Sequence, residues 1–296
     1  MTEKYLTANG IELAYDEFGE PENPAILLIM GLGTQMIAWP ESLCQSLAAR
    51  GYRVIRFDNR DIGLSQKMEN TRSPHLLKIL LYSRFNIPLK VPYKLHDMAD
   101  DAVGVLDALG LESVHIVGAS MGGMIAQLIA AHHPLRVLSL TSIMSTSGDR
   151  SLPGPDREVK ARMITRPAST MAEVIIEHSI GTYRLIASPG FPMSDDELHE
   201  RFTRSYHRSY YPAGFKRQMA AIVASGDRVA ELKKITAPTL VIHGKADRLV
   251  PFAGGVDTAR HIPDAKLELI EGMGHDMPLP LVPKLVELIG DHIDRV

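Results

Sequence analysis

The feature that most constrains this chain is a five-residue stretch, Gly118-Ala119-Ser120-Met121-Gly122, between a short β-branched run and a helical pattern. A serine at a strand-to-helix junction lies on a tight turn. Glycines two residues to either side allow that turn and let the strand and the helix approach closely. The pattern predicts a hydroxyl group raised above the end of a sheet, beside a helix N-terminus whose dipole favours negative charge.

The composition excludes several classes of protein. Of the 296 residues, 45% are hydrophobic and 23% are charged, and the formal net charge is −3. This near-neutral balance gives no electrostatic reason to expect nucleic acid as a partner. The longest apolar runs, such as 25–30, are too short to cross a bilayer, and residues 1–5 do not begin a signal peptide. A single cysteine, Cys44, excludes an intrachain disulfide, so we expect a cytoplasmic protein without stable membrane insertion.

The order of apolar patterns indicates an α/β fold. Residues 5–8 and 11–15 alternate around Asn9-Gly10, which is typical of a β-hairpin. Predicted strands and helices then alternate, which favours a mostly parallel, doubly wound sheet with helices on both faces. The predicted strands are 25–30, 53–57, 113–117, 135–143, 239–242 and 266–270, and the predicted helices are 38–50, 97–109, 121–132, 252–260 and 282–293.

One long segment interrupts this alternation. Residues 146–235 are helical and polar in stretches, contain six prolines between 153 and 212, and are too long for a loop inside a compact sheet. We interpret them as a helical cap inserted over the strand ends. The predicted core domain is then 1–145 together with 236–296.

A serine hydroxyl is a weak nucleophile unless a base and an orienting acid lie nearby. Asp247 follows the predicted strand 239–242, and His275 follows the predicted strand 266–270. Both therefore leave the same edge of the sheet as Ser120, where open α/β sheets bind ligands. His243 is a rival for the base, but His275 fits better because it follows the last strand and glycines at 272 and 274 free its loop. Three other aspartates are rivals for the acid, but they lie in or near helices or the cap: Asp227, Asp257 and Asp264.

These motifs resemble those of the α/β-hydrolase superfamily, in its bacterial serine carboxylesterase type. The resemblance rests on 118–123, 238–247 and 272–275, and it covers nearly the whole chain, least of all the cap. Within the superfamily, residues 29–33, 39–40 and 58–65 are similar to those of the aclacinomycin methylesterase-like group. One position departs from the family pattern, because Met30 stands where a histidine usually precedes the oxyanion-loop glycine.

The resemblance implies a role for each candidate residue. Ser120 would attack an ester carbonyl, His275 would act as base and then acid, and Asp247 would orient His275. The amides of Leu32 and Met121 would form the oxyanion hole. No cofactor and no metal are implied. We expect the substrate pocket to be lined by Gly31, Gly33, Met144 and Met273.

The resulting hypothesis is a serine hydrolase that cleaves carboxylic esters of small to medium apolar substrates through an acyl-serine intermediate. A polyketide methylesterase, a lactonase or a C–C bond hydrolase would use the same residues. A non-catalytic ligand-binding relative is the alternative from another class. The protein is expected to be a monomer or a homodimer, and neither 132–133 nor 100–101 has the spacing of a metal site.

Two further features carry expectations. Arg60 and Asp61 are expected to form an ion pair that holds the loop after the strand 53–57. The basic, apolar segment 71–96 contains no acidic residue. Three interpretations of it stay open: a helix packed on the cap over the pocket, a dimer surface, or a lid that contacts lipid.

Overall fold

The computed structural model describes residues 3–71, 75, 79, 82, 85, 87 and 89–296. Its centre is an eight-stranded sheet with the order β1-β2-β4-β3-β5-β6-β7-β8. The first hairpin pairs antiparallel and joins β4 antiparallel, and all later pairs are parallel, as the sequence predicts. The strands are β1 (Lys4–Ala8), β2 (Ile11–Phe18), β3 (Ala25–Ile29), β4 (Arg53–Phe57), β5 (Val114–Ala119), β6 (Val137–Ile143), β7 (Thr239–Gly244) and β8 (Lys266–Ile270).

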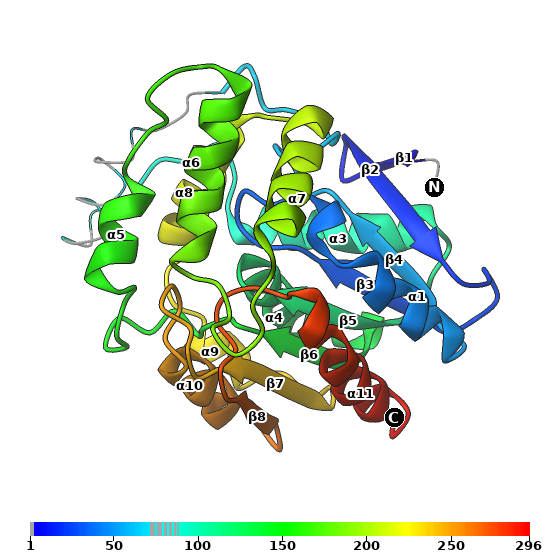
Figure 1. Ribbon diagram of the computed structural model, residues 1–296. Helices are drawn as coiled ribbons and strands as arrows, with labels where there is room; N and C mark the ends of the chain where they lie inside the picture. The colour runs from blue at the N-terminus through cyan, green and yellow to red at the C-terminus, as the bar shows by residue number, and fades with distance from the viewer. Residues whose placement is uncertain are drawn as a thin grey trace.

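Helices cover both faces of the sheet (Figure 1). One buried cluster joins the sheet to α3 (Leu95–Ala108) and α4 (Met121–His132). A second cluster, on the other face, joins it to α1 (Glu41–Ala49) and α11 (Val282–Ile293). A further helix, α10 (Ala253–His261), connects β7 with β8. The doubly wound architecture is therefore confirmed.

Two of the predicted boundaries that differ from the structure lie at a proline. The predicted helix 38–50 begins only at Glu41, after a short 3₁₀ turn at Met36–Ala38, because Pro40 disfavours helical backbone in the residue before it. Trp39 is consequently a fully buried loop residue. The predicted strand 135–143 begins only at Val137, because Pro134–Arg136 form a 3₁₀ turn.

The segment between β6 and β7 is helical throughout its regular parts. It contains α5 (Arg157–Met163), α6 (Ala172–Arg184), α7 (Asp195–Arg208), α8 (Pro212–Ser225) and α9 (Val229–Leu232). A small apolar cluster of its own joins α6 to α7 through Ile176, Ile180, Tyr183 and Leu198. Figure 1 shows α6, α7 and α8 grouped on one side of the molecule, and we refer to residues 146–235 as the cap.

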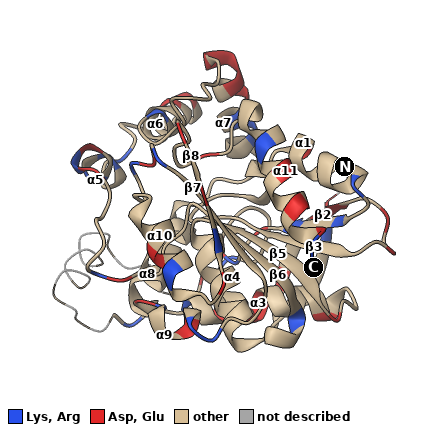
Figure 2. Cartoon of the chain, turned by 90° about the horizontal axis from the view of Figure 1, so that it is seen from below, with Lys and Arg blue, Asp and Glu red and all other residues tan. Residues whose placement is uncertain are grey.

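Charged side chains of both signs are interspersed over the described elements, as Figure 2 shows. None of the helices described by the structure combines the length and the apolar character needed to cross a membrane. The expectation for residues 71–96 lies largely outside the described residues. Its continuous described part is 89–96, where α3 starts at Leu95, two residues before the predicted position.

Candidate active site

Ser120 lies on a strained turn between β5 and α4. Its φ is +56° and its ψ is −118°, a conformation that non-glycine residues rarely adopt. A Cβ at Gly118 would clash with the Gly122 carbonyl oxygen, and one at Gly122 would clash with the Ile29 carbonyl oxygen. Both glycines are therefore required for the close approach that the sequence predicts.

The three predicted side chains form a continuous hydrogen-bonded chain. Ser120 Oγ lies 2.9 Å from His275 Nε2, and His275 Nδ1 lies 2.7 Å from Asp247 Oδ2. A carboxylate only accepts hydrogen bonds, so the imidazole proton is on Nδ1 and Nε2 accepts from the serine hydroxyl. This arrangement can take a proton from Ser120 and stabilise the imidazolium that results.

Asp247 is held by the turn that follows β7. Its other oxygen, Oδ1, accepts hydrogen bonds from the amides of Leu249 at 2.9 Å and Val250 at 2.8 Å. Burial by itself would raise the pKa of this carboxyl group. The charge of His275 and hydrogen bonds from His243 and His275 outweigh burial and lower the pKa to about 2. Asp247 is therefore ionised at neutral pH.

His243, the rival base, lies beside the same carboxylate. Its Nε2 is 2.8 Å from the Val250 carbonyl oxygen and 3.4 Å from Asp247 Oδ2. The ring is fully buried, and its Nδ1 has no hydrogen-bond partner among the described residues. His243 therefore packs behind the acid and does not reach the serine.

Two backbone amides near Ser120 remain available as donors. Neither the Leu32 amide nor the Met121 amide donates a hydrogen bond to any described residue. Met121 directly follows Ser120, and a Cβ built on Gly31 would lie 3.1 Å from the Ser120 Cβ. The loop after β3 thus lies against the serine.

The predicted pocket residues occupy different depths. Gly33 is exposed, has a φ of +66°, and lies against the Phe215 ring of α8. Met144 is 4% exposed and Met273 is fully buried, and both belong to the core cluster beneath the site. Gly31 directly borders Ser120. A pocket lined by these four residues stays a prediction.

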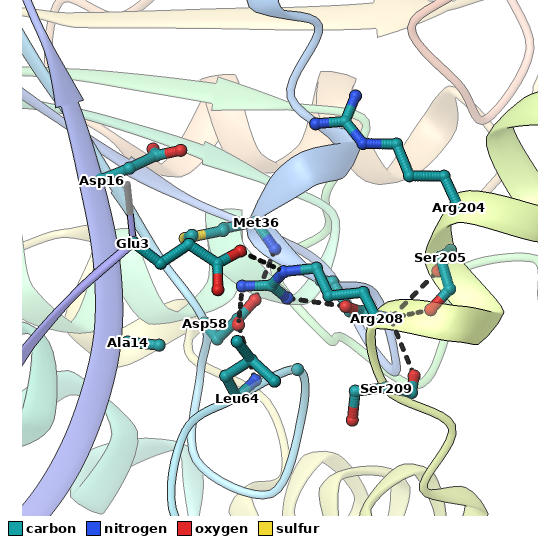
Figure 3. Close-up of polar contacts among 12 residues, drawn as sticks. Glu3, Ala14, Asp16, Met36, Asp58, Leu64, Arg204, Ser205, Arg208 and Ser209 are labelled. Carbon is teal, nitrogen blue, oxygen red and sulfur yellow. Dashed lines mark hydrogen bonds and ion pairs between the residues drawn. The ribbon is translucent and has the colours of Figure 1, made fainter. Parts of the chain in front are cut away.

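A network centred on Arg208 of α7 attaches the loop after β3 to the cap (Figure 3). Arg208 forms an ion pair with the fully buried Asp58 at 2.7 Å and donates to Gln35 Oε1 at 2.6 Å. Asp58 also accepts the Met36 amide at 2.7 Å. Gln35 donates in turn to the Ser205 carbonyl oxygen of α7 at 2.7 Å. The cap therefore helps to fix the loop that carries the Leu32 amide.

The prediction that Arg60 and Asp61 form an ion pair with each other is wrong, because each pairs with another residue. Arg60 binds both oxygens of Asp101 in α3 at 2.5 Å. Asp61 binds Arg217 of the cap helix α8 through two contacts of 2.8 and 2.6 Å. The two residues lie in a turn in which Asp61 has a φ of +72°, and each side chain pairs with a helix distant in the sequence. Both pairs still hold the loop after β4.

Asp276 is a buried polar residue that the sequence analysis missed. It is 5% exposed and accepts hydrogen bonds from Tyr183 Oη, Ser188 Oγ and the Ser188 amide, all in the cap. The Ser188 hydroxyl also accepts from the Gly274 amide at 2.8 Å. The only sequence signal was an acidic residue directly after His275.

Backbone hydrogen bonds reinforce the same contact. The His275 amide donates to the Ile186 carbonyl oxygen at 2.7 Å, and the Gly190 amide donates to the Gly272 carbonyl oxygen at 2.9 Å. A Cβ at either of these two glycines would lie within 2.9 Å of the other residue's backbone. Residues 272–276 and 186–190 therefore form one packed unit between the core and the cap.

This fold is that of the α/β hydrolases. A family model described as the alpha/beta hydrolase fold matches residues 24–279, so the chain belongs to that family. It is 30% identical to the rhodomycin D methylesterase DauP of Streptomyces sp. strain C5, over 99% of this chain and 98% of that protein. It is 25% identical to 3-oxoadipate enol-lactonase 2 of Acinetobacter baylyi, over 90% of this chain and 87% of that one.

Solved structures agree with the fold. The structure of the meta-cleavage product hydrolase CumD from Pseudomonas fluorescens IP01 aligns with a TM-score of 0.77 at 21% identity, covering 99% of this chain and 97% of that one.

Proposed function

We propose that this protein is a serine hydrolase that cleaves carboxylic esters of small to medium apolar substrates. The observation that carries the proposal is the continuous hydrogen-bonded chain from Ser120 through His275 to Asp247, with contacts of 2.9 and 2.7 Å. Family membership and the methylesterase relatives support the same reaction class.

In the proposed mechanism, Ser120 Oγ attacks the ester carbonyl carbon while its proton moves to His275 Nε2. The tetrahedral intermediate collapses, the C–O bond to the alcohol breaks, and His275 returns the proton to the leaving alcohol. Water then attacks the acyl-Ser120 ester with His275 as base, releasing the carboxylic acid and restoring the serine. Asp247 stays ionised throughout and stabilises the imidazolium.

The charge that develops on the carbonyl oxygen needs fixed donors. The amides of Leu32 and Met121 are proposed for this role because neither is engaged elsewhere in the described structure. One such donor is worth about 3–4 kcal/mol of transition-state stabilisation. The N-terminus of α4 adds a favourable dipole. Water is the second substrate, so the reaction requires no cofactor.

The natural ester is a narrower question. Two relatives are named as rhodomycin D methylesterases, which favours a methyl ester as the substrate. Relatives named as enol-lactonases and as a 2-hydroxymuconate semialdehyde hydrolase leave lactone or C–C cleavage as alternatives. A non-catalytic binding role is disfavoured by the complete set of reacting groups. The cytoplasmic location, the monomeric or homodimeric state and the lack of a nucleic-acid partner remain part of the proposal.

The test is hydrolysis of a p-nitrophenyl ester series from acetate to palmitate, with Ser120→Ala as the matched inactive variant. The proposal predicts turnover that peaks at one chain length and is abolished in Ser120→Ala. Hydrolysis by Ser120→Ala at the wild-type rate would reject the assignment. If no ester in the series is cleaved, methyl esters and lactones of bulky acids test the narrower alternatives.

A further inference from the structure

Three side chains of the types that ligate metals in proteins meet on the surface, away from Ser120. His96 lies in the first turn of α3, His132 is the last residue of α4, and Glu231 lies in the short helix α9. One potential ligand atom from each lies within 4.8 Å of the other two. The two imidazole centroids are 5.5 Å apart and their planes are tilted by 57°. The rings converge, and they are not stacked face to face.

The backbones that carry these side chains are held in place by buried contacts. Arg228, directly before α9, is 1% exposed and donates to Gln127 of α4 and to the Thr146 carbonyl oxygen. The Leu95 amide at the start of α3 donates to Ser225 Oγ at the end of α8. The three ligand positions are thus fixed relative to one another before any ion binds, which lowers the cost of binding.

The three side chains have no competing partners. None of them makes a hydrogen bond or an ion pair with another residue in the part of the chain that the structure describes. His133, next in sequence, differs because its Nε2 lies 3.6 Å from Asp100 Oδ1. His96 and His132 are exposed, so an ion in solution reaches both without any rearrangement.

We propose that His96, His132 and Glu231 form a binding site for a divalent transition-metal ion of the zinc class. Two imidazoles and one carboxylate are ligands that suit such ions, whereas magnesium and calcium prefer oxygen alone. Ligand bonds of about 2.1 Å place tetrahedral ligand atoms about 3.4 Å apart, so small rotations of exposed side chains complete the site. Water fills the remaining position.

The location defines what the ion does. α9 is the point where the chain returns from the cap towards β7, and it packs against α4 (Figure 1). An ion bound there links this return segment to α3 and α4. Ser120 precedes the other end of α4, about 18 Å away at 1.5 Å per helical residue, so the ion takes no part in ester cleavage. Its effect is on the stability of the cap junction.

The ligands lie far apart in the sequence, which is why no spacing motif revealed them. The site has only one carboxylate, and the ammonium group of Lys234 acts on His132 as well. Both features weaken cation binding relative to a buried structural site. We therefore expect a dissociation constant for Zn²⁺ in about the micromolar range.

The experiment is calorimetric titration of the EDTA-treated, dialysed full-length protein with Zn²⁺, comparing the wild type, His132→Ala and the matched control His133→Ala. The proposal predicts one equivalent bound by the wild type and by His133→Ala. In His132→Ala the affinity falls at least about tenfold. Saturating Zn²⁺ also raises the melting temperature of the wild type and of His133→Ala, and this rise is lost in His132→Ala.

Two results would overturn the proposal. One is the lack of stoichiometric Zn²⁺ binding to the wild type. The other is equal affinity in the wild type and in His132→Ala, which would place bound zinc elsewhere, for example at His275. Glu231→Gln and His96→Ala provide independent checks, since each removes one ligand without touching the reacting residues.

Discussion

The loop that carries His275 has a buried carboxylate on each side, and the two are held in opposite ways. On the core side, Asp247 contacts two histidines and accepts two backbone amides. On the cap side, Asp276 accepts only hydroxyl and amide donors, from Tyr183 and Ser188. Imidazole rings contact Asp247, whereas neutral groups donate the hydrogen bonds to Asp276, and the charge of Arg201 acts on Asp276 besides.

The pKa values follow from this difference. Burial raises the pKa of both carboxyl groups. At Asp247 the charge and hydrogen bonds of His275 and His243 reverse the effect, and the pKa falls to about 2. At Asp276 burial prevails over the hydrogen bonds from Ser188 and Tyr183, and the pKa stays above its usual value. Similar burial thus serves two purposes: Asp247 is suited to stabilise a charged histidine, and Asp276 to dock the cap.

The largest expected effect is the difference in kcat between variants that replace Asp247 and variants that replace Asp276. Asp247→Asn should lower kcat by about 10⁴-fold, because the amide no longer favours the correct tautomer of His275 or its charged form. Asp276→Asn keeps a hydrogen-bond acceptor on the cap side, so kcat should fall by less than about 100-fold. Steady-state hydrolysis of the best p-nitrophenyl ester measures both. Equal losses would show that the two carboxylates do not differ as described.

The comparison of buried carboxylates extends to Asp61, which forms an ion pair with the cap. Arg217 of α8 is 2% exposed and pairs with the fully buried Asp61. Arg217→Met leaves that carboxylate buried without its cation and should destabilise the protein by about 3–5 kcal/mol in urea unfolding. Arg204→Met is the matched control, because the Arg204–Glu41 pair between α7 and α1 is exposed to solvent. It should cost less than about 1 kcal/mol. Similar losses in the two variants would contradict this ranking.

A smaller effect tests whether the hydrogen bond from Tyr183 to Asp276 helps to position His275. Tyr183→Phe removes one donor from Asp276 and should cost about 1–3 kcal/mol of stability. Because Asp276 adjoins His275, kcat should fall while KM changes little. Tyr206→Phe is the control, since the Tyr206 hydroxyl makes no hydrogen bond to the described residues. A change in stability with kcat unaltered would mean that Tyr183 acts on the cap alone.

The smallest expected effect is a difference in how the free energy of unfolding depends on pH. The pKa of Asp276 is raised in the folded state, so ionisation costs stability as pH rises from about 3.9 through its folded value. Asp61 has a lowered pKa, because Arg217 and Tyr93 outweigh its burial, so its contribution is lost as pH falls below about 3.9. Asp276→Asn should therefore be less harmful at higher pH, and Asp61→Asn more harmful. Urea unfolding from about pH 3 to about pH 7 measures the two slopes, and slopes of the same sign would refute the assignment.

How far the sequence predicted this molecule depends on the range of each interaction. The turn at Ser120 and the alternation of strands and helices along the chain were predictable, because glycine spacing and apolar periodicity act locally. Asp247 and His275 were predictable because parallel strands bring their following loops to one edge of the sheet. The partners of Arg60 and Asp61 were not, since each binds a helix distant in sequence. Asp276 was missed for the same reason: its donors lie in the cap, whose packing no local pattern encodes.

The most direct test of the central claim is labelling with a fluorophosphonate probe, followed by mass spectrometry of the modified peptide. The account predicts one label per chain, on Ser120, with no label in Ser120→Ala and a strongly reduced labelling rate in His275→Ala. Ester hydrolysis that persists while Ser120 stays unlabelled, or a label on another serine that abolishes activity, would contradict it.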